Sequence, residues 1–219
     1  MDEEARVSAA LPVVETFHSL QGEGCHSGRS AFFIRLGGCN VGCRWCDTKH
    51  SWPMQQHPVR SLQALAEEAQ KAADAGAGFV VITGGEPLHH NLDPLCQALA
   101  TVQTTGQRAI PVHLETSGVD PLSGRFEWIT LSPKPHRPPT AELLGACHEL
   151  KVVVSSADDL IFAQAMAQAT QSERRQSPAV LLLQPAWGDA SATALTLEHV
   201  RRHPIWGLSL QTHKWLDIR

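Results

Sequence analysis

Several features that assign a chain to a broad class of proteins are missing from this sequence. No apolar run approaches the about 20 residues that a membrane-crossing helix needs, so we expect no membrane association. No run of Lys and Arg is longer than a pair, and the net charge is −4. A nucleic-acid partner, which requires a clustered cationic face, is therefore disfavoured. Residues 1–4 are acidic and lack the basic, then apolar, layout of a secretory signal, which predicts a cytoplasmic protein.

Internal repeats, low-complexity tracts and linkers are missing as well. The chain of 219 residues is 42% hydrophobic and 18% charged, which is typical of a globular protein. This length can be accommodated in one α/β domain with a single core. We therefore predict one domain over residues 1–219.

Short β-branched runs alternate with longer helical patterns along the chain. The expected strands are residues 13–17, 32–36, 79–83, 109–115, 128–131, 150–155, 180–184 and 208–212. The expected helices are residues 61–75, 92–104, 158–171 and 194–203. Strands that are separated by helices pair in parallel, which predicts an α/β fold. Since residues 116–149 hold little long helix and a complete barrel needs about 250 residues, we predict a partial, open (β/α) barrel with reduced helix content.

Polar clusters follow the carboxyl ends of six expected strands. They begin at Gly37, Gly84, Thr116, Ser132, Pro185 and Thr212. Enzymes of the barrel type assemble their active sites at this end of the strands. The sequence therefore predicts an active site along that rim.

Three of the six cysteines fall within eight residues, and we call Cys39, Cys43 and Cys46 the cysteine triad. Thiolates at such short spacing on an irregular loop can converge on one metal centre. Three thiolates on a four-iron cluster leave one iron open, and the amino and carboxylate groups of S-adenosylmethionine (SAM) can chelate it. The competing interpretation is a structural zinc site completed by His50 or His26.

Two neighbouring features favour SAM over zinc. Trp45 offers a flat apolar face for an adenine ring. The expected strand 79–83 runs into Gly84 and Gly85, which expose backbone groups, and into Glu86, whose carboxylate can take the SAM ammonium. The other cysteines, Cys25, Cys96 and Cys147, are expected to be bystanders or small buried hydrophobes.

The stretch 39–46, CNVGCRWC, resembles the CxxxCxxC signature of radical SAM enzymes, and 83–87, TGGEP, resembles their SAM motif. Five further stretches resemble the 7-carboxy-7-deazaguanine synthase family: SLQGEG at 19–24, CDTKH at 46–50, ETSG at 115–118, SPK at 132–134 and QTHK at 211–214. That family rearranges 6-carboxy-5,6,7,8-tetrahydropterin into 7-carboxy-7-deazaguanine with loss of ammonia, on the route to queuosine. The resemblance covers nearly the whole chain, from about residue 13 onward.

The resemblance implies a 4Fe–4S cluster held by the cysteine triad and a Mg²⁺ ion bound by Thr48. It implies SAM contacts from Gly85, Ser132, Pro133, Lys134 and Gln184. It implies substrate contacts from Leu20, Gln21, Gly22, Glu23, Arg35, Thr83 and His213. No further catalytic side chain is implied. The family also implies a homodimer and an electron donor similar to flavodoxin or ferredoxin.

Simpler roles exist for several of these residues. Arg35 can be a strand-end cation, Thr48 can hydrogen-bond its own loop, and Lys134 and His213 can be solvated surface groups. A radical SAM activase that makes a glycyl radical on a protein shares the triad and TGGEP but leaves SLQGEG and CDT unexplained. A zinc-stabilised interaction module without catalysis is the alternative from another class.

Overall fold

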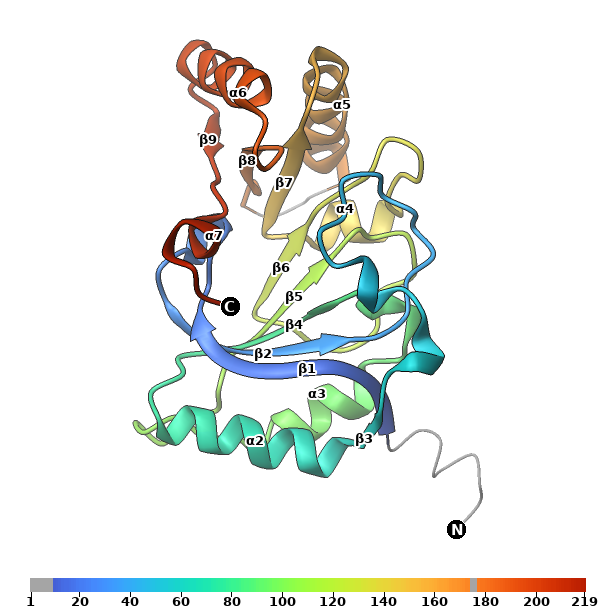
Figure 1. Cartoon of the computed structure of the whole chain (residues 1–219), viewed down its shortest axis with the longest axis vertical. Coiled ribbons are helices and arrows are strands. Elements are labelled where there is room, and N and C mark those ends of the chain that lie inside the picture. Colours follow the sequence, from blue (N-terminus) through green and yellow to red (C-terminus); the bar gives the residue numbers. More distant parts are fainter. Residues whose placement is uncertain (1–9, 174–176) are drawn as a thin grey trace. The chain divides into compact units, whose positions relative to one another are not determined.

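The computed structural model describes residues 10–173 and 177–219, which divide into two compact units (Figure 1). The first unit consists of Met1–Leu20, Arg29–Glu115 and Ser123–Trp128. The second consists of Gln21–Gly28, Thr116–Leu122 and Ile129–Arg219. The acidic residues 1–4 lie outside the described part of the chain. A single domain over residues 1–219 stays a prediction.

The first unit is a mixed sheet covered by two helices. Its strands are β1 (Ala10–Leu20), β2 (Ser30–Leu36), β3 (Val59–Ser61), β4 (Val80–Gly84) and β5 (Val112–Thr116). Neighbouring strands follow the order β3-β1-β2-β4-β5, with β1 antiparallel to β2 and β3 and the remaining pairs parallel. Helices α2 (Leu62–Asp74) and α3 (Asp93–Leu99) pack on each other along β1 and β2 (Figure 1).

Alternation along these strands gives the sheet two different faces. On one face, the register neighbours Ile34, Ile82 and Leu114 are fully buried. On the other face, an apolar cluster is formed by Phe17, Ala31, Phe33, Phe79 and Val81. Toward the carboxyl ends of the parallel strands that second face becomes polar.

Helix α2 begins where its sequence signals predict. The Ser61 hydroxyl accepts a hydrogen bond from Ala64 N at 3.2 Å, which caps the amino end. The helix ends before Gly76, whose φ of 103° is left-handed. Helix α3 is shorter than the predicted helix 92–104 because the chain turns after Leu99, and Gln103 forms a bridge with Ala109.

The second unit is a parallel sheet with four helices. Its strands are β6 (Trp128–Leu131), β7 (Glu149–Val154), β8 (Val180–Pro185) and β9 (Trp206–Leu208), adjacent in that order. Its helices are α4 (Ala141–Ala146), α5 (Ala157–Glu173), α6 (Ala190–Arg202) and α7 (Thr212–Leu216). Helix α5 packs on α4 and β7, and α6 packs on β8 and β9. Among the described residues no helix is long and apolar enough to cross a membrane.

One predicted strand is wrong. Residues 208–212 do not form a strand, because β9 already ends at Leu208 and the chain turns into α7 at Thr212. Thr212 N and Oγ1 both donate to Gly22 O at 2.9 Å. This long-range contact fixes the start of α7, and a local propensity reading of the residues could not reveal it.

Candidate active site

The cysteine triad lies on the irregular segment between β2 and β3. Cys39 N donates to Trp52 O at 3.1 Å and Cys46 N donates to Cys43 O at 3.3 Å. Cys39, Cys43 and Cys46 form no disulfide, and all three are partly exposed. Burial raises the pKa of the Cys39 thiol, and the charges of Glu86, Cys43 and Cys46 raise it further, against a backbone hydrogen bond from Val41. The three sulfur atoms are therefore close enough to act on one another, and a cationic group among them would stabilise their thiolate forms.

Zinc and an iron–sulfur cluster differ in how they take their protein ligands. Structural zinc takes four ligands on one ion, whereas a four-iron cluster has its thiolates on different irons. The donor set of the triad, three thiolates, suits such a cluster with one iron left open. Within residues 10–173 and 177–219, no group of three or more His, Cys, Asp or Glu side chains is placed to hold a single metal ion.

The turn after β4 lies directly against the beginning of the segment that carries the triad. Gly85 N donates to Leu36 O and Glu86 N donates to Gly38 O, both at 2.9 Å. A Cβ atom at position 85 would stand 2.3 Å from Gly38 O and 2.9 Å from the Cβ of Cys39. Only glycine allows this approach. The predicted SAM residue Gly85 is thus beside a cluster ligand.

Glu86 is buried in the turn after β4. The side chain is 1% exposed, and its Oε1 accepts a hydrogen bond from Leu88 N at 3.2 Å. This contact caps the short helix Pro87–His89. That Glu86 takes the SAM ammonium stays a prediction.

A polar row crosses the sheet of the first unit at the carboxyl ends of its parallel strands. Glu15, Arg35 and Thr83 are register neighbours on β1, β2 and β4. Arg35 Nε donates to Glu15 Oε1 at 3.0 Å, and Thr83 Oγ1 donates to Glu115 Oε2 at 2.9 Å. Two predicted substrate residues, Arg35 and Thr83, are therefore side by side. Each already has a carboxylate partner, and sequence reasoning did not identify Glu15.

Thr48 lies close to the triad, as its position in the CDT motif requires. Its hydroxyl is 3.6 Å from Cys46 Sγ, and its carbonyl accepts hydrogen bonds from Ser51 N and Ser51 Oγ. The backbone of Thr48 therefore stabilises the loop, while the hydroxyl makes only the weak contact with sulfur. That oxygen could serve as one hard ligand, and Mg²⁺ would need its remaining ligands from elsewhere.

The loop Gln21–Gly28 belongs to the second unit and presents three of the predicted substrate residues. Gln21 is buried, and its Oε1 accepts from Glu23 N at 3.1 Å. Gly22 lies against His213, since a Cβ at position 22 would stand 2.1 Å from the Nδ1 atom of that histidine. His213 is therefore brought to the loop by α7, and the requirement for glycine at position 22 follows from the contact. Leu20, at the end of β1, is exposed.

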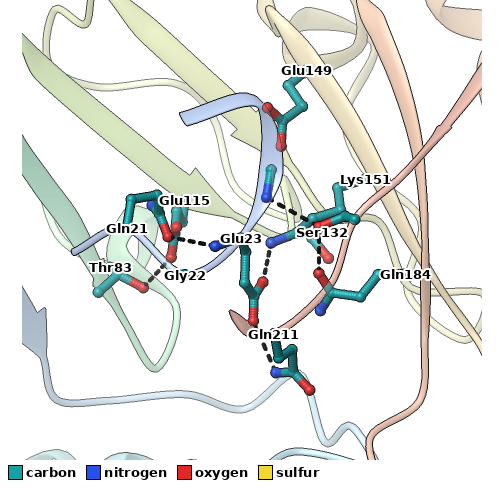
Figure 2. A network of polar contacts seen from close by, with 12 residues as sticks. Gln21, Gly22, Glu23, Thr83, Glu115, Ser132, Glu149, Lys151, Gln184 and Gln211 are labelled. Atoms are coloured by element: carbon teal, nitrogen blue, oxygen red, sulfur yellow. Dashed lines mark hydrogen bonds and ion pairs between the residues drawn. The ribbon is translucent and has the colours of Figure 1, made fainter. Parts of the chain in front are cut away.

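Glu23 is the centre of a partly buried network of charged and polar side chains (Figure 2). Its carboxylate forms an ion pair with Lys151 and accepts from Gln211 Nε2 at 2.8 Å. Burial acts to raise the pKa of Glu23, but the charge of Lys151, hydrogen bonds from Lys151 and Gln211, and the charge of His213 together lower it to about 2. Glu23 is thus ionised at neutral pH, and an ionised carboxylate is purely an acceptor.

The remaining predicted SAM residues also lie in the second unit. Ser132 follows β6, and the Lys134 ammonium donates to Ser132 O and Oγ at 2.7 Å each. Gln184, on β8, is 4% exposed, and its Oε1 accepts from Ser209 Oγ at 2.8 Å. Pro133 stands between the first two residues. Lys134 is therefore held against its own turn and is not a freely solvated loop charge.

Sequence reasoning missed the residues of β7 that hold the loop. Besides Lys151, Glu149 is buried and its Oε2 accepts from Cys25 N at 2.9 Å. Burial, together with the charge of Glu149 and a hydrogen bond to it, raises the pKa of the Cys25 thiol to about 12. No motif includes Glu149 or Lys151. The available signal was the presence of two charged residues in an otherwise apolar strand, where unpaired charges are seldom tolerated.

Comparison with known proteins identifies the class. Residues 33–131 match the radical SAM superfamily, so the chain is a radical SAM enzyme, and a 4Fe–4S cluster and SAM are its cofactors as predicted. It is 51% identical to 7-carboxy-7-deazaguanine synthase of Prochlorococcus marinus, over 97% of this chain and 100% of that one. It is 47% identical to 7-carboxy-7-deazaguanine synthase of Synechocystis, over 97% and 96%. The chain therefore belongs to the 7-carboxy-7-deazaguanine synthase family.

A solved structure supports the same assignment. The crystal structure of QueE from Escherichia coli is similar with a TM-score of 0.76 at 32% sequence identity, covering 93% of this chain and 95% of that chain. The predicted fold class, a partial, open (β/α) barrel of the radical SAM type, is confirmed. The zinc module and the activase are not supported.

Proposed function

We propose that the protein converts 6-carboxy-5,6,7,8-tetrahydropterin to 7-carboxy-7-deazaguanine with loss of ammonia, as a carbon–nitrogen lyase in 7-deazapurine biosynthesis. The observation that carries this proposal is the partly buried, ionised Glu23 beside Gln21. The edge of a pterin is rich in N–H groups, and an acceptor-only carboxylate next to a carboxamide is the pair that reads such an edge.

The radical chemistry requires the cluster and SAM. When bound, they supply one-electron cleavage of a carbon–sulfur bond and a 5′-deoxyadenosyl radical, which takes hydrogen from an unreactive carbon. The cysteine triad would hold the cluster, and Gly85, which lies against Cys39, is a proposed SAM contact. Ser132, Pro133, Lys134 and Gln184 are the proposed further SAM contacts.

The proposed substrate contacts divide according to the chemistry of their side chains. Glu23 and Gln21 recognise the N–H edge of the pterin by hydrogen bonding. Arg35 pairs with the substrate carboxylate, and Thr83 supplies a hydroxyl. Leu20, Gly22 and His213 complete the set. Arg35 approaches this role already paired with Glu15, so the substrate carboxylate would share the guanidinium, whose five N–H donors can serve two partners.

Mg²⁺ remains a proposal that depends on the hydroxyl of Thr48. Its proximity to Cys46 would place a bound ion near the cluster. One Thr hydroxyl provides one of about six ligands, so substrate oxygens and water would provide the others. Such an ion would act on the substrate as a Lewis acid.

A homodimer, a flavodoxin- or ferredoxin-like electron donor and a cytoplasmic location complete the proposal. The homodimer is supported by exposed apolar side chains that are concentrated between residues 205 and 218. They are Ile205, Leu208, Leu210, Trp215, Leu216 and Ile218. Exposed apolar side chains at this density along the chain are consistent with a protein interface.

Anaerobic turnover decides the proposed function. The reconstituted protein is incubated with 6-carboxy-5,6,7,8-tetrahydropterin, SAM, Mg²⁺ and a chemical reductant, and the products are identified by mass. We expect 7-carboxy-7-deazaguanine and ammonia, with about four iron and four sulfide per chain. Because loss of ammonia leaves the conversion redox-neutral, the abstracted hydrogen must be returned, and SAM should not be consumed in proportion to the product. SAM cleavage that proceeds without consumption of the pterin would contradict the proposed substrate.

A further inference from the structure

Two charged residues on β7 hold the loop Gln21–Gly28 at two points. Lys151 is 5% exposed and Glu149 is 1% exposed. They are two residues apart on a strand, so both side chains emerge on the same face of the sheet. Lys151 pairs with the Glu23 side chain (Figure 2), while Glu149 accepts from the backbone N–H of Cys25. The strand thereby sets both the path of the loop and the direction of its carboxylate.

The ion pair between Lys151 and Glu23 has a role beyond stabilising the fold. Charges are costly to bury, and an apolar pair of similar size would stabilise the fold as well or better. What the ion pair provides is an ionised carboxylate in a partly buried position, with Lys151 6% and Glu23 18% exposed. Gln211 fixes the second oxygen of Glu23, so the carboxylate cannot rotate freely. It keeps about two of its roughly four acceptor directions for other donors.

We propose that Lys151 is a positioning residue for substrate recognition, which holds the Glu23 carboxylate in the charge state and orientation that receive two N–H groups of the pterin edge. This inference rests on the proposed function and names a residue that acts on that site through another residue. Lys151 would not touch the substrate. If Glu23 gained a proton it would present a donor to the donors of the pterin, and the recognition would fail.

Other charged groups also face Glu23 and must be kept constant in any test. His213 comes from α7 and acts on Glu23 through its charge. Lys214 donates to Gln211 Oε1 at 3.1 Å, and Glu149 stands next to Lys151 along β7. Among these groups, histidine is the type whose ordinary titration lies near neutral pH. Variants that change only position 151 or 23 leave it in place.

Four variants separate positioning from structural support: Lys151→Met, Lys151→Arg, Glu23→Gln and the double variant Glu23→Gln/Lys151→Met. Arg201→Met, which removes an exposed cation from α6, is the matched control. Each protein is reconstituted, and its iron content, SAM cleavage, melting temperature, and kcat and KM for the pterin are measured between pH 6 and pH 8.

In Lys151→Met, burial is no longer opposed by the ammonium, so the pKa of Glu23 should rise. We expect KM for the pterin to increase about tenfold, equivalent to about 1.4 kcal/mol, and to increase further as pH falls, with a smaller change in kcat. Lys151→Arg keeps the positive charge. Its KM should therefore stay independent of pH, unlike that of Lys151→Met. Iron content and SAM binding should match those of the wild type in every variant.

The double variant gives the sharpest result. With both charges removed, its melting temperature should return to that of the wild type, while KM stays about tenfold higher as in Glu23→Gln. A double variant with wild-type KM would overturn the proposal, and so would a Lys151→Met variant that is less stable but has an unchanged, pH-independent KM. If Lys151→Met does not fold, the KM values of the double variant and of Lys151→Arg test the proposal. A wild-type protein that does not consume the pterin would refute the proposed function instead.

Discussion

A pterin that lacks the 6-carboxylate should bind the wild-type protein about tenfold more weakly than the carboxylated substrate, and this difference should depend on Arg35. A hydrogen bond to a charged group contributes ~1.5–3 kcal/mol, and ~1.4 kcal/mol corresponds to one decade of affinity. The lower end of this energy range applies to Arg35. Arg35 remains paired with Glu15 when the ligand has no carboxylate, and the two side chains are 18% and 28% exposed, so no isolated buried cation is left behind.

Calorimetry with both pterins on three proteins measures the effect. Arg35→Met should bind the two ligands with nearly equal affinity, while its affinity for SAM stays unchanged. Glu15→Gln should bind the carboxylated pterin severalfold more tightly than the wild type does, because the competing carboxylate loses its charge while the hydrogen-bond geometry is kept. Discrimination between the pterins should therefore increase in Glu15→Gln and disappear in Arg35→Met.

Equal binding of the two pterins by the wild type would refute this reasoning. So would a Glu15→Gln variant that binds the carboxylated pterin more weakly. Either result would leave Arg35 as a strand-end cation whose partner is Glu15.

Three further outcomes follow from the geometry near the cluster. Alanine at any member of the cysteine triad should abolish iron binding and SAM cleavage, whereas Cys25→Ala should retain iron; equal loss of iron in both would contradict the triad. Thr48→Val should weaken the Mg²⁺ dependence of turnover without affecting SAM binding, and an unchanged Mg²⁺ titration would remove Thr48 from the metal site. Gly85→Ala should lower both melting temperature and SAM affinity, since its Cβ would stand 2.3 Å from a backbone oxygen; unchanged SAM binding would show that this turn does not contact the cofactor.

The sequence predicted the fold where local patterns are strong. Strands β2, β4, β6 and β8 agree with their predicted runs to within two residues at each end. Alternation and β-branched residues define these strands without help from the rest of the chain. The short helices α4 and α7, with six and five residues, were not predicted because a helix of one or two turns has little periodicity to detect.

The site was predictable as far as its residues lie in motifs. The motifs named the triad, Gln21, Glu23 and His213, and the structure brings Gln21, Glu23 and His213 to one loop and its surroundings. Lys151 and Glu149 could not be predicted in the same way. Their partners are 128 and 124 residues away, so only the folded chain relates them. The same holds for Glu15, whose pairing with Arg35 depends on the register of β1 and β2.

The loop Gln21–Gly28 has a consequence for the order in which the protein is completed. Its contacts with Ser209, Gln211 and Thr212 span 185, 188 and 190 residues. Closing so long a segment costs little more entropy than closing one half as long, because the cost grows only with the logarithm of length. The separation does set the order in which the contacts of the loop can form. During synthesis these partners leave the ribosome after β7, which carries Lys151 and Glu149. The loop can therefore be held by β7 before it contacts residues 209–212, and Gln211 adds the second contact of the Glu23 carboxylate after the first can already have formed.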